Sequence, residues 1–275
     1  MNTIRRLRCG PRQGVVTFLG RIARARRAWF NAYLSGVRPL SAASLSYSMR
    51  FKVLKGLSGV FVAVTSTGIV AGFFSAPVSA AQSPGQVITV QAATSRSVVA
   101  VVRAWKLKSD GMYVEVFGPV VADVGVHGVG PTSEGRGRTP AGVFSLTQAF
   151  GNEANNGTKL PYFRAGPDDW WDENPASRMY NRHVRSPVSP GGASENLYYA
   201  GAAYANAVVI NYNTNRVIKG AGSGFFLHDS FYAPTQGCVA VPAKDLNWLM
   251  RWLRPSLHPA ISIGVGANAR AVLGI

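Results

Sequence analysis

Cysteine is scarce in this 275-residue chain, which has only two, Cys9 and Cys238. Cys9 lies in a basic N-terminal segment, so Cys238 is the single thiol of the remaining chain. A lone thiol has no internal disulfide partner, which excludes a small domain held together by disulfides. The presence of Cys238 therefore needs another explanation, and nucleophilic catalysis is the usual one when a histidine lies within reach.

Acidic residues are absent from residues 1–55, which hold twelve of the 29 Lys and Arg, and residues 56–81 carry no charge at all. The formal net charge of +17 therefore belongs mostly to the N-terminal segment. Residues 82–275 carry a net charge of only +5, from 17 basic and 12 acidic side chains. This mild surplus does not predict nucleic-acid binding; it suits work near an anionic cell-wall polymer and equally suits simple solubility.

Metal-ligand spacing and phosphate-binding motifs are also missing. His127, His183 and His258 show no ligand spacing with one another or with carboxylates, so we predict no metal. The glycines of 125–137 are not followed by Gly-Lys-Ser/Thr, so they do not form a phosphate-binding loop. We predict no cofactor.

From Met49 onward the sequence has the order of a secretory signal peptide. Three basic residues in 49–55 precede the apolar stretch 56–74, and the small residues of 76–81 offer cleavage after Ala80 or Ala81. We therefore predict a signal peptide over 49–81 and an exported, cell-wall location. The alternative is a permanent membrane anchor, because about 19 apolar residues just span a bilayer. Residues 1–48 form a basic leader, and we hypothesise that translation starts at Met49.

The rest of the chain predicts a single mainly β domain, sandwich-like or barrel-like, with one or two short helices. We assign the small, polar residues 82–96 to a short tether and 97–275 to the domain. Leu246, Leu249, Met250 and Leu253 have the spacing of one helical face. The predicted strands are rich in β-branched and other apolar residues, and they are 98–105, 112–117, 120–126, 143–146, 207–212, 225–227 and 261–265.

Residues 150–200 show no clear period and are predicted to be irregular. Within them Trp170 and Trp171 are flanked by four acidic residues. This cluster could stack on glycan or attract an amine, but a solvated loop with buried aromatic rings is the better interpretation.

A candidate catalytic pair follows from Cys238 and His228, which lies ten residues upstream at the end of an apolar run. A cysteine attacks as its thiolate, so it needs either a depressed pKa or an adjacent base, and His228 is the candidate base. Gly237 permits a tight turn before the thiol, and the backbone amides around Gly237–Cys238 are candidate oxyanion donors. The structural alternative is a buried Cys238 that packs as a small apolar residue and a His228 that only caps a strand.

Three sequence motifs surround this pair, namely Thr139-Pro140-Ala141-Gly142-Val143-Phe144, Leu227-His228, and Thr235-Gln236-Gly237-Cys238-Val239. In combination they resemble the L,D-transpeptidase (YkuD-like) catalytic-domain family over most of 98–265. The family pattern has a Thr-Pro-x-Gly-x-Phe segment, a catalytic histidine, and a Ser/Thr-x-Gly-Cys turn followed by an apolar residue.

The resemblance implies a cysteine enzyme that acts on peptidoglycan stem peptides. Cys238 would form a thioester with release of D-alanine, and an amine of a neighbouring stem would resolve it into a cross-link. It further implies that a backbone carbonyl near Asp229 or Ser230 orients His228, with the Asp229 carboxylate as a second candidate. Carbapenem-type β-lactams are the expected inhibitors. The residues expected to contact substrate are Thr235, Gln236, Tyr180 and Asn181.

The chain departs from the family pattern at three points. The interval between His228 and Cys238 is short, Gln236 stands where many members have a second histidine, and Ala240 replaces a frequent Arg or Asn. These departures leave two alternatives to transpeptidation open, an L,D-carboxypeptidase-like hydrolase and a non-catalytic cell-wall-binding protein.

Overall fold

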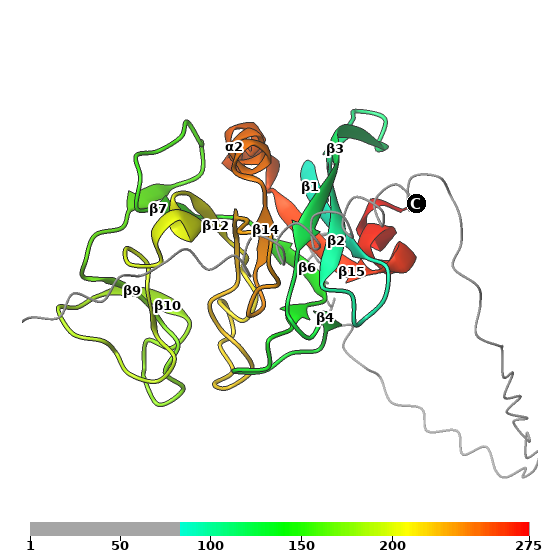
Figure 1. Cartoon of the computed structure of the whole chain (residues 1–275). Coiled ribbons are helices and arrows are strands. Elements are labelled where there is room, and N and C mark those ends of the chain that lie inside the picture. Colours follow the sequence, from blue (N-terminus) through cyan, green and yellow to red (C-terminus); the bar gives the residue numbers. More distant parts are fainter. Residues whose placement is uncertain (1–82, 275) are drawn as a thin grey trace, which may run out of the picture.

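The computed structural model describes residues 83–274 and confirms the prediction of a mainly β fold with short helices (Figure 1). The predicted leader, 1–48, and the predicted signal peptide, 49–81, lie outside the described residues. Within 83–274 no helix has the length and apolar character needed to cross a bilayer.

Ten strands of the described part form one mixed sheet in the order β6-β15-β1-β2-β3-β14-β13-β12-β7-β8. In that order their bounds are Gly142–Ser145, Ala260–Val265, Gln86–Ala92, Val99–Leu107, Tyr113–Asp123, Val239–Val241, Phe226–Asp229, Ala207–Val209, Ala149–Gly151 and Tyr162–Arg164. The two stretches predicted as separate strands before and after residue 118 form one strand, β3, with an irregular register against β2. A two-stranded sheet pairs β4 (Val129–Gly130) with β5 (Thr139–Pro140).

Strand β1 corrects the predicted tether, because residues 86–92 lie inside the sheet. They pair in parallel with β15 and antiparallel with β2. Val87, Ile88 and Val90 are fully buried. The polar residues that suggested a tether are satisfied by distant partners, since Trp105 Nε1 donates to Thr89 Oγ1 at 2.9 Å and Gln86 Nε2 donates to the carbonyl of Trp252 at 2.8 Å.

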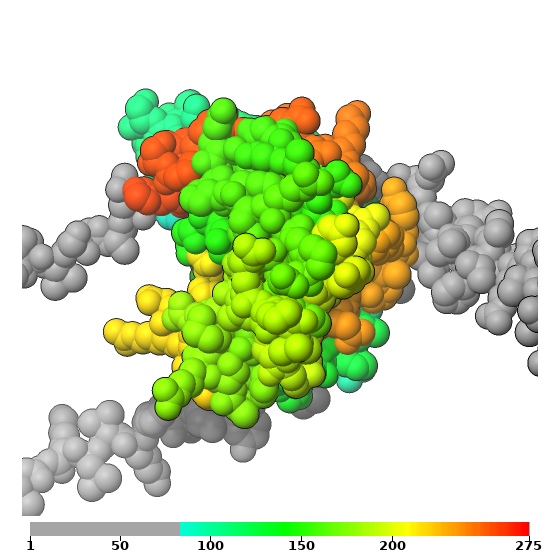
Figure 2. All heavy atoms as spheres, turned by 90° about the vertical axis from the view of Figure 1, so that its left-hand side faces the viewer, coloured from blue at the N-terminus to red at the C-terminus, as the bar shows by residue number. Residues whose placement is uncertain are grey.

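Residues 150–200 are also more regular than predicted. A three-stranded sheet has the order β10 (Arg182–Arg185), β9 (Asp169–Asp172) and β11 (Glu195–Asn196), and the short 3₁₀ helix η1 (Gly201–Tyr204) follows. Trp171 on β9 is buried, and its ring packs edge-on against Phe226 with the centroids 5.1 Å apart. These segments form the left side of Figure 1, and their green and yellow atoms cover the face turned to the reader in Figure 2.

The helix predicted near the C-terminus is α2 (Ala243–Trp252), which follows Pro242. Leu246, Leu249 and Met250 on its inner face are buried in the main core beneath the sheet. Two further 3₁₀ helices, η2 (Pro255–Leu257) and η3 (Gly266–Leu273), flank β15.

A second, smaller core includes residues of β12 and β13 and also contains Cys238. It contains Phe150, Trp171, Tyr204 and Phe226 together with Cys238. The thiol is therefore the edge of a packed aromatic cluster, which holds it in place.

We predict that Ile88→Ala lowers the free energy of unfolding by roughly 2–5 kcal/mol, because it opens a cavity at a fully buried position of β1. Urea denaturation measures this loss. The matched control is Val188→Ala, whose side chain is 68% exposed and whose loss should stay within about 0.5 kcal/mol. Equal, small effects at both positions would mean that 86–92 is a tether after all.

Candidate active site

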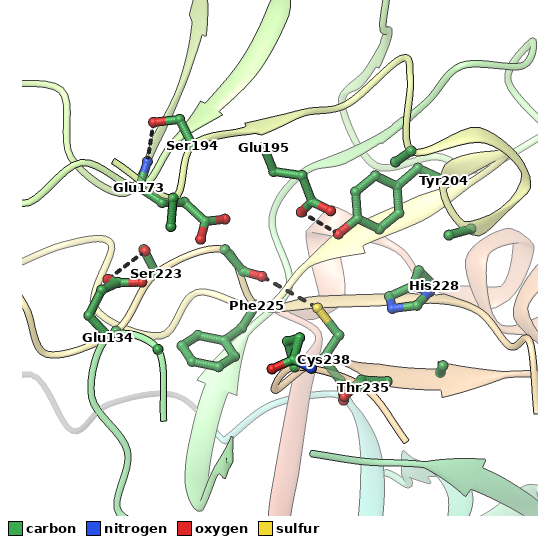
Figure 3. Close-up of a pocket in the computed structure, with 18 of the residues that line it drawn as sticks. Glu134, Glu173, Ser194, Glu195, Tyr204, Ser223, Phe225, His228, Thr235 and Cys238 are labelled. Carbon is green, nitrogen blue, oxygen red and sulfur yellow. Dashed lines mark hydrogen bonds between the residues drawn. The ribbon is translucent and has the colours of Figure 1, made fainter. Parts of the chain in front are cut away.

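A cavity of about 790 Å³ opens at the ends of β13 and β14 and holds both Cys238 and His228 (Figure 3). Its walls come from four other parts of the chain as well, which are the loop after β4, the segment from Glu173 through β11 to η1, residues 222–225 before β13, and the loop between β13 and β14. The cavity is therefore assembled from distant segments around one thiol.

The register of β13 and β14 brings the thiol and the imidazole together. The strands are parallel, with Leu227 opposite Val239 and His228 opposite Ala240. The same register puts Cys238 beside Phe226, whose N–H donates to Sγ at 3.4 Å. Because alternate residues share a face, Phe226 and His228 project to the same side of the sheet, where Cys238 is the diagonal neighbour of His228.

The turn before the nucleophile requires glycine. Gly237 has φ +144°, and a Cβ there would lie 2.5 Å from Cε1 of Phe225. Its amide donates to Thr235 Oγ1 at 3.1 Å, inside the turn. The Gly237 amide is thus already engaged, and the predicted oxyanion role rests on the amide of Cys238.

Thr139 connects the Thr-Pro-x-Gly motif to the nucleophile across 99 residues. Its fully buried hydroxyl accepts from the amide of Gly125 at 2.8 Å and donates to the carbonyl of Cys238 at 3.3 Å. Thr235 Oγ1 donates to the same carbonyl at 2.7 Å. Two threonine hydroxyls therefore anchor the backbone of the nucleophile.

His228 is oriented by backbone, since its Nδ1 lies 2.8 Å from the carbonyl oxygen of Asp229. A carbonyl only accepts, so Nδ1 carries the proton and Nε2 of the neutral ring is free to act as a base. Burial lowers the pKa of His228 to about 4, and the hydrogen bond to Asp229 offsets this only in part. The imidazole is therefore neutral at physiological pH.

Neither Asp229 nor Ser230 orients the ring with its side chain. Oδ1 of Asp229 is buried without a hydrogen-bond partner within the described part of the chain, and burial raises the pKa of this carboxyl to about 6. The Ser230 hydroxyl donates to the carboxylate of Asp123 on β3. Of the orienting groups expected here, the geometry uses the Asp229 carbonyl.

The thiol of Cys238 is neutral as well. Burial, and next the negative charge of Glu195, raise its pKa far above the usual range, although the N–H of Phe226 acts in the opposite direction. The sulfur donates to the carbonyl of Gly224 at 3.4 Å. Of the two ways to activate a cysteine, this site has the adjacent base and lacks the depressed pKa.

The four residues expected to contact substrate divide into two pairs. Thr235 and Gln236 line the cavity. Tyr180 and Asn181 are only 1% and 2% exposed and lie behind the wall, which corrects that part of the prediction. Oδ1 of Asn181 accepts from Trp171 Nε1 at 2.9 Å and from the amide of Gly224 at 3.1 Å, so this residue supports the loop that contacts the thiol.

Glu134, Glu173 and Glu195 line one acidic wall of the cavity. Glu173 belongs to the acidic cluster around Trp170 and Trp171 for which a solvated loop was the better interpretation, whereas Glu134 and Glu195 were missed by the sequence prediction. Burial, and next the charge of Glu195, raise the pKa of Glu173 to about 8, and burial raises that of Glu195. The hydroxyls of Tyr180 and Ser223 donate to Glu134. No local signal marks Glu134 and Glu195, because they come from separate segments that meet Glu173 only in the fold.

The cavity also has a basic residue, Arg136, which lies two residues after Glu134 in the loop after β4. Arg136 also lines an adjoining depression of about 330 Å³, whose other lining residues are Ser95, Arg96, His127 and Arg138. A ligand that spans both therefore meets carboxyl groups and guanidinium groups. Across 83–274, no group of three or more His, Cys, Asp and Glu side chains is placed to hold a metal ion.

A buried thiol with a neutral, backbone-oriented histidine beside it is the arrangement of a cysteine acyl-transfer site. The model of the L,D-transpeptidase catalytic domain, YkuD, matches residues 94–262. The chain therefore belongs to the YkuD family, as the sequence motifs predicted. Among curated proteins, none matches this chain.

We predict that Thr139→Val costs about 1–3 kcal/mol of unfolding free energy, because it leaves the buried Gly125 amide without its acceptor and removes one donor to the Cys238 carbonyl. Urea denaturation measures the change. Thr147→Val is the control, since Thr147 is exposed and its loss should stay within about 0.5 kcal/mol. A cost at Thr139 no larger than at Thr147 would contradict the anchoring role.

We predict that the depressed pKa of His228 by itself lowers stability on acidification between pH 6.5 and about 4. The raised pKa values of Asp229 and Glu173 act in the opposite direction, so the comparison with a His228 variant isolates its contribution. In this window the unfolded chain binds a proton that the folded chain does not, so the contribution of His228 to stability falls as the pH falls, by on the order of 3 kcal/mol in total. Urea denaturation at pH 7 and pH 4.5 measures the loss. The His228→Gln variant should lose less on acidification, and an unchanged loss would contradict the assignment.

Proposed function

We propose that this protein is an exported L,D-transpeptidase that forms or remodels peptidoglycan cross-links through a thioester on Cys238. The observation that carries the proposal is the placement of Cys238 and His228 as diagonal neighbours in one cavity of a YkuD domain. Export rests on the signal-peptide pattern of 49–81 in the sequence.

In the first half-reaction Sγ attacks the carbonyl carbon between the L-centre of a diaminopimelate-type residue and the terminal D-alanine. Because thiol and imidazole both begin neutral, Nε2 of His228 takes the thiol proton as the C–S bond forms. In this proposal the Cys238 amide stabilises the oxyanion. The C–N bond then breaks, His228 passes its proton to the leaving nitrogen, and D-alanine departs.

In the second half-reaction the amine of a neighbouring stem attacks the thioester. His228 takes a proton from the attacking nitrogen, the C–S bond breaks, and the proton returns to Sγ. The thiol is regenerated and a new amide bond joins the two stems. No ATP is consumed, because the energy of the cleaved peptide bond is carried by the thioester.

The charge of the cavity favours transfer over hydrolysis. Glu195 lies on a wall close to the thiol, and its carboxylate attracts an ammonium group far more strongly than it attracts water, whereas burial keeps Glu173 largely protonated at neutral pH. The basic residues around Arg136 suit the carboxylates of a stem peptide. A stem peptide carries both amine and carboxylate groups, so it suits the mixed charge of the cavity lining.

We predict that the purified protein converts a disaccharide-tetrapeptide into a cross-linked dimer that lacks one D-alanine, and that Cys238→Ala does not. Mass spectrometry of the products measures the outcome. Tripeptide alone, from the wild-type protein only, would show the hydrolase instead.

A carbapenem controls for a wrong choice of peptide in this assay. The folded wild-type protein should gain the mass of one carbapenem on Cys238, and Cys238→Ala should gain none. Absence of both product and adduct in a protein with a cooperative unfolding transition would leave the non-catalytic wall-binding role.

A further inference from the structure

Tyr204, at the end of η1, contacts the catalytic pair although the mechanism above does not use it. Its side chain is 4% exposed, and its ring packs edge-on against the imidazole of His228 with the centroids 5.3 Å apart. The same ring packs edge-on against Phe226 at 5.4 Å. Two contacts therefore fix the imidazole of His228. Its Nδ1 donates to the Asp229 carbonyl, and its ring makes an edge-on contact with the ring of Tyr204.

The hydroxyl of Tyr204 lies between an acid and the nucleophile. It donates to Oε2 of Glu195 at 2.7 Å. In Figure 3 the phenol oxygen lies between the Glu195 carboxylate and the sulfur of Cys238. The two groups act on the thiol in opposite directions, because the charge of Glu195 raises the pKa of Cys238 and the Tyr204 hydroxyl lowers it.

A phenol has one proton to donate, so Glu195 and the sulfur compete for it. While Glu195 is ionised, its carboxylate accepts the hydrogen bond from the Tyr204 hydroxyl, and its negative charge also disfavours a thiolate on Cys238. When Glu195 is neutralised, by a proton or by an ammonium group of a ligand, both effects are relieved at once.

We propose that Tyr204 is a positioning residue whose hydroxyl stabilises negative charge developing on Cys238 Sγ, and that Glu195 controls this role by competing for the hydroxyl proton. The consequence is a thiol that stays inert in the empty cavity and gains reactivity when a cationic ligand pairs with Glu195. This deepens the proposed acyl-transfer function and rests on it.

Four titratable groups bear on Cys238, and the test must separate them. They come from four segments and are Glu173 after β9, Glu195 on β11, Tyr204 on η1 and His228 on β13. The chain also offers a matched pair in the same region, because the buried Tyr180 hydroxyl donates to Glu134, and neither of the two is among the groups that shift the pKa of the thiol directly.

The experiment measures the rate of alkylation of Cys238 by iodoacetamide between pH 7 and pH 10. Tyr204→Phe keeps the ring and removes the donor, so alkylation should slow about tenfold at each pH. Glu195→Gln removes the charge and should speed alkylation about tenfold. In the Tyr204→Phe background, Glu195→Gln should accelerate alkylation less than it does alone, because the released hydroxyl is missing.

The controls are Tyr180→Phe and Glu134→Gln, which should change the alkylation rate far less than Tyr204→Phe and Glu195→Gln do, because Glu134 reaches the thiol only through its charge on Glu173. Shifts of equal size and direction in the two pairs would overturn the proposal, since a general loosening of the cavity would then explain them. Unchanged rates in Tyr204→Phe and Glu195→Gln would overturn it too. If Tyr204→Phe fails to fold, the test is the comparison of alkylation rates between Glu195→Gln and Glu134→Gln, and only a faster rate in Glu195→Gln supports the proposal.

Alkylation needs no peptide substrate, so this result is independent of the transpeptidase assay. A shift in alkylation without cross-linking would support the Tyr204–Glu195 coupling and refute the proposed reaction. Cross-linking by the wild-type protein, together with unchanged alkylation rates in the variants, would support the proposed reaction and refute the Tyr204–Glu195 coupling.

Discussion

The site depends on the parallel pairing of β13 and β14, which sets His228 opposite Ala240 and thereby makes His228 and Cys238 diagonal neighbours on one face. A slip of one residue would turn the thiol or the imidazole to the other face. The rest of the domain prevents such a slip. Leu227 and Val239 are locked into the main core on one side, Phe226 and Cys238 belong to the aromatic core on the other, and the hydroxyls of Thr139 and Thr235 hold the end of the nucleophile turn.

Burial gives this pair its chemical character. It keeps the thiol protonated and the imidazole unprotonated, so the resting site is neutral and charge appears only during reaction. The negative charge of Glu195 beside the thiol raises the free energy of the thiolate. A cationic ligand that pairs with Glu195 would remove this penalty. The hydrogen bond from Tyr204 to Glu195 would connect such a ligand to Cys238 if the proposed coupling holds, and this would explain why carboxyl groups line the cavity around the thiol.

The fold was predictable where local pattern and burial agree. The apolar strand β12 and the amphipathic helix α2 follow from their side chains alone. Strand β1 could not be predicted in this way. Gln86 and Thr89 are polar, and only the folded chain supplies the hydrogen-bond partners, Trp252 and Trp105, that allow them to be buried in a sheet. The region 150–200 was misread for the same reason, since its strands are short and are stabilised by contacts such as Trp171 on Phe226.

The sequence by itself determined the family and the candidate reactive groups, since a lone thiol, a nearby histidine and a Thr-Pro-x-Gly segment are legible as residue types and spacing. Only the tertiary structure decided which groups share the cavity. It placed Tyr180 and Asn181 behind the wall, brought Glu173, Glu195 and Tyr204 to the thiol, and made the Asp229 carbonyl the partner of His228. The physical reason is that pKa and proximity depend on burial and on contacts between distant segments, and neither is encoded in local spacing.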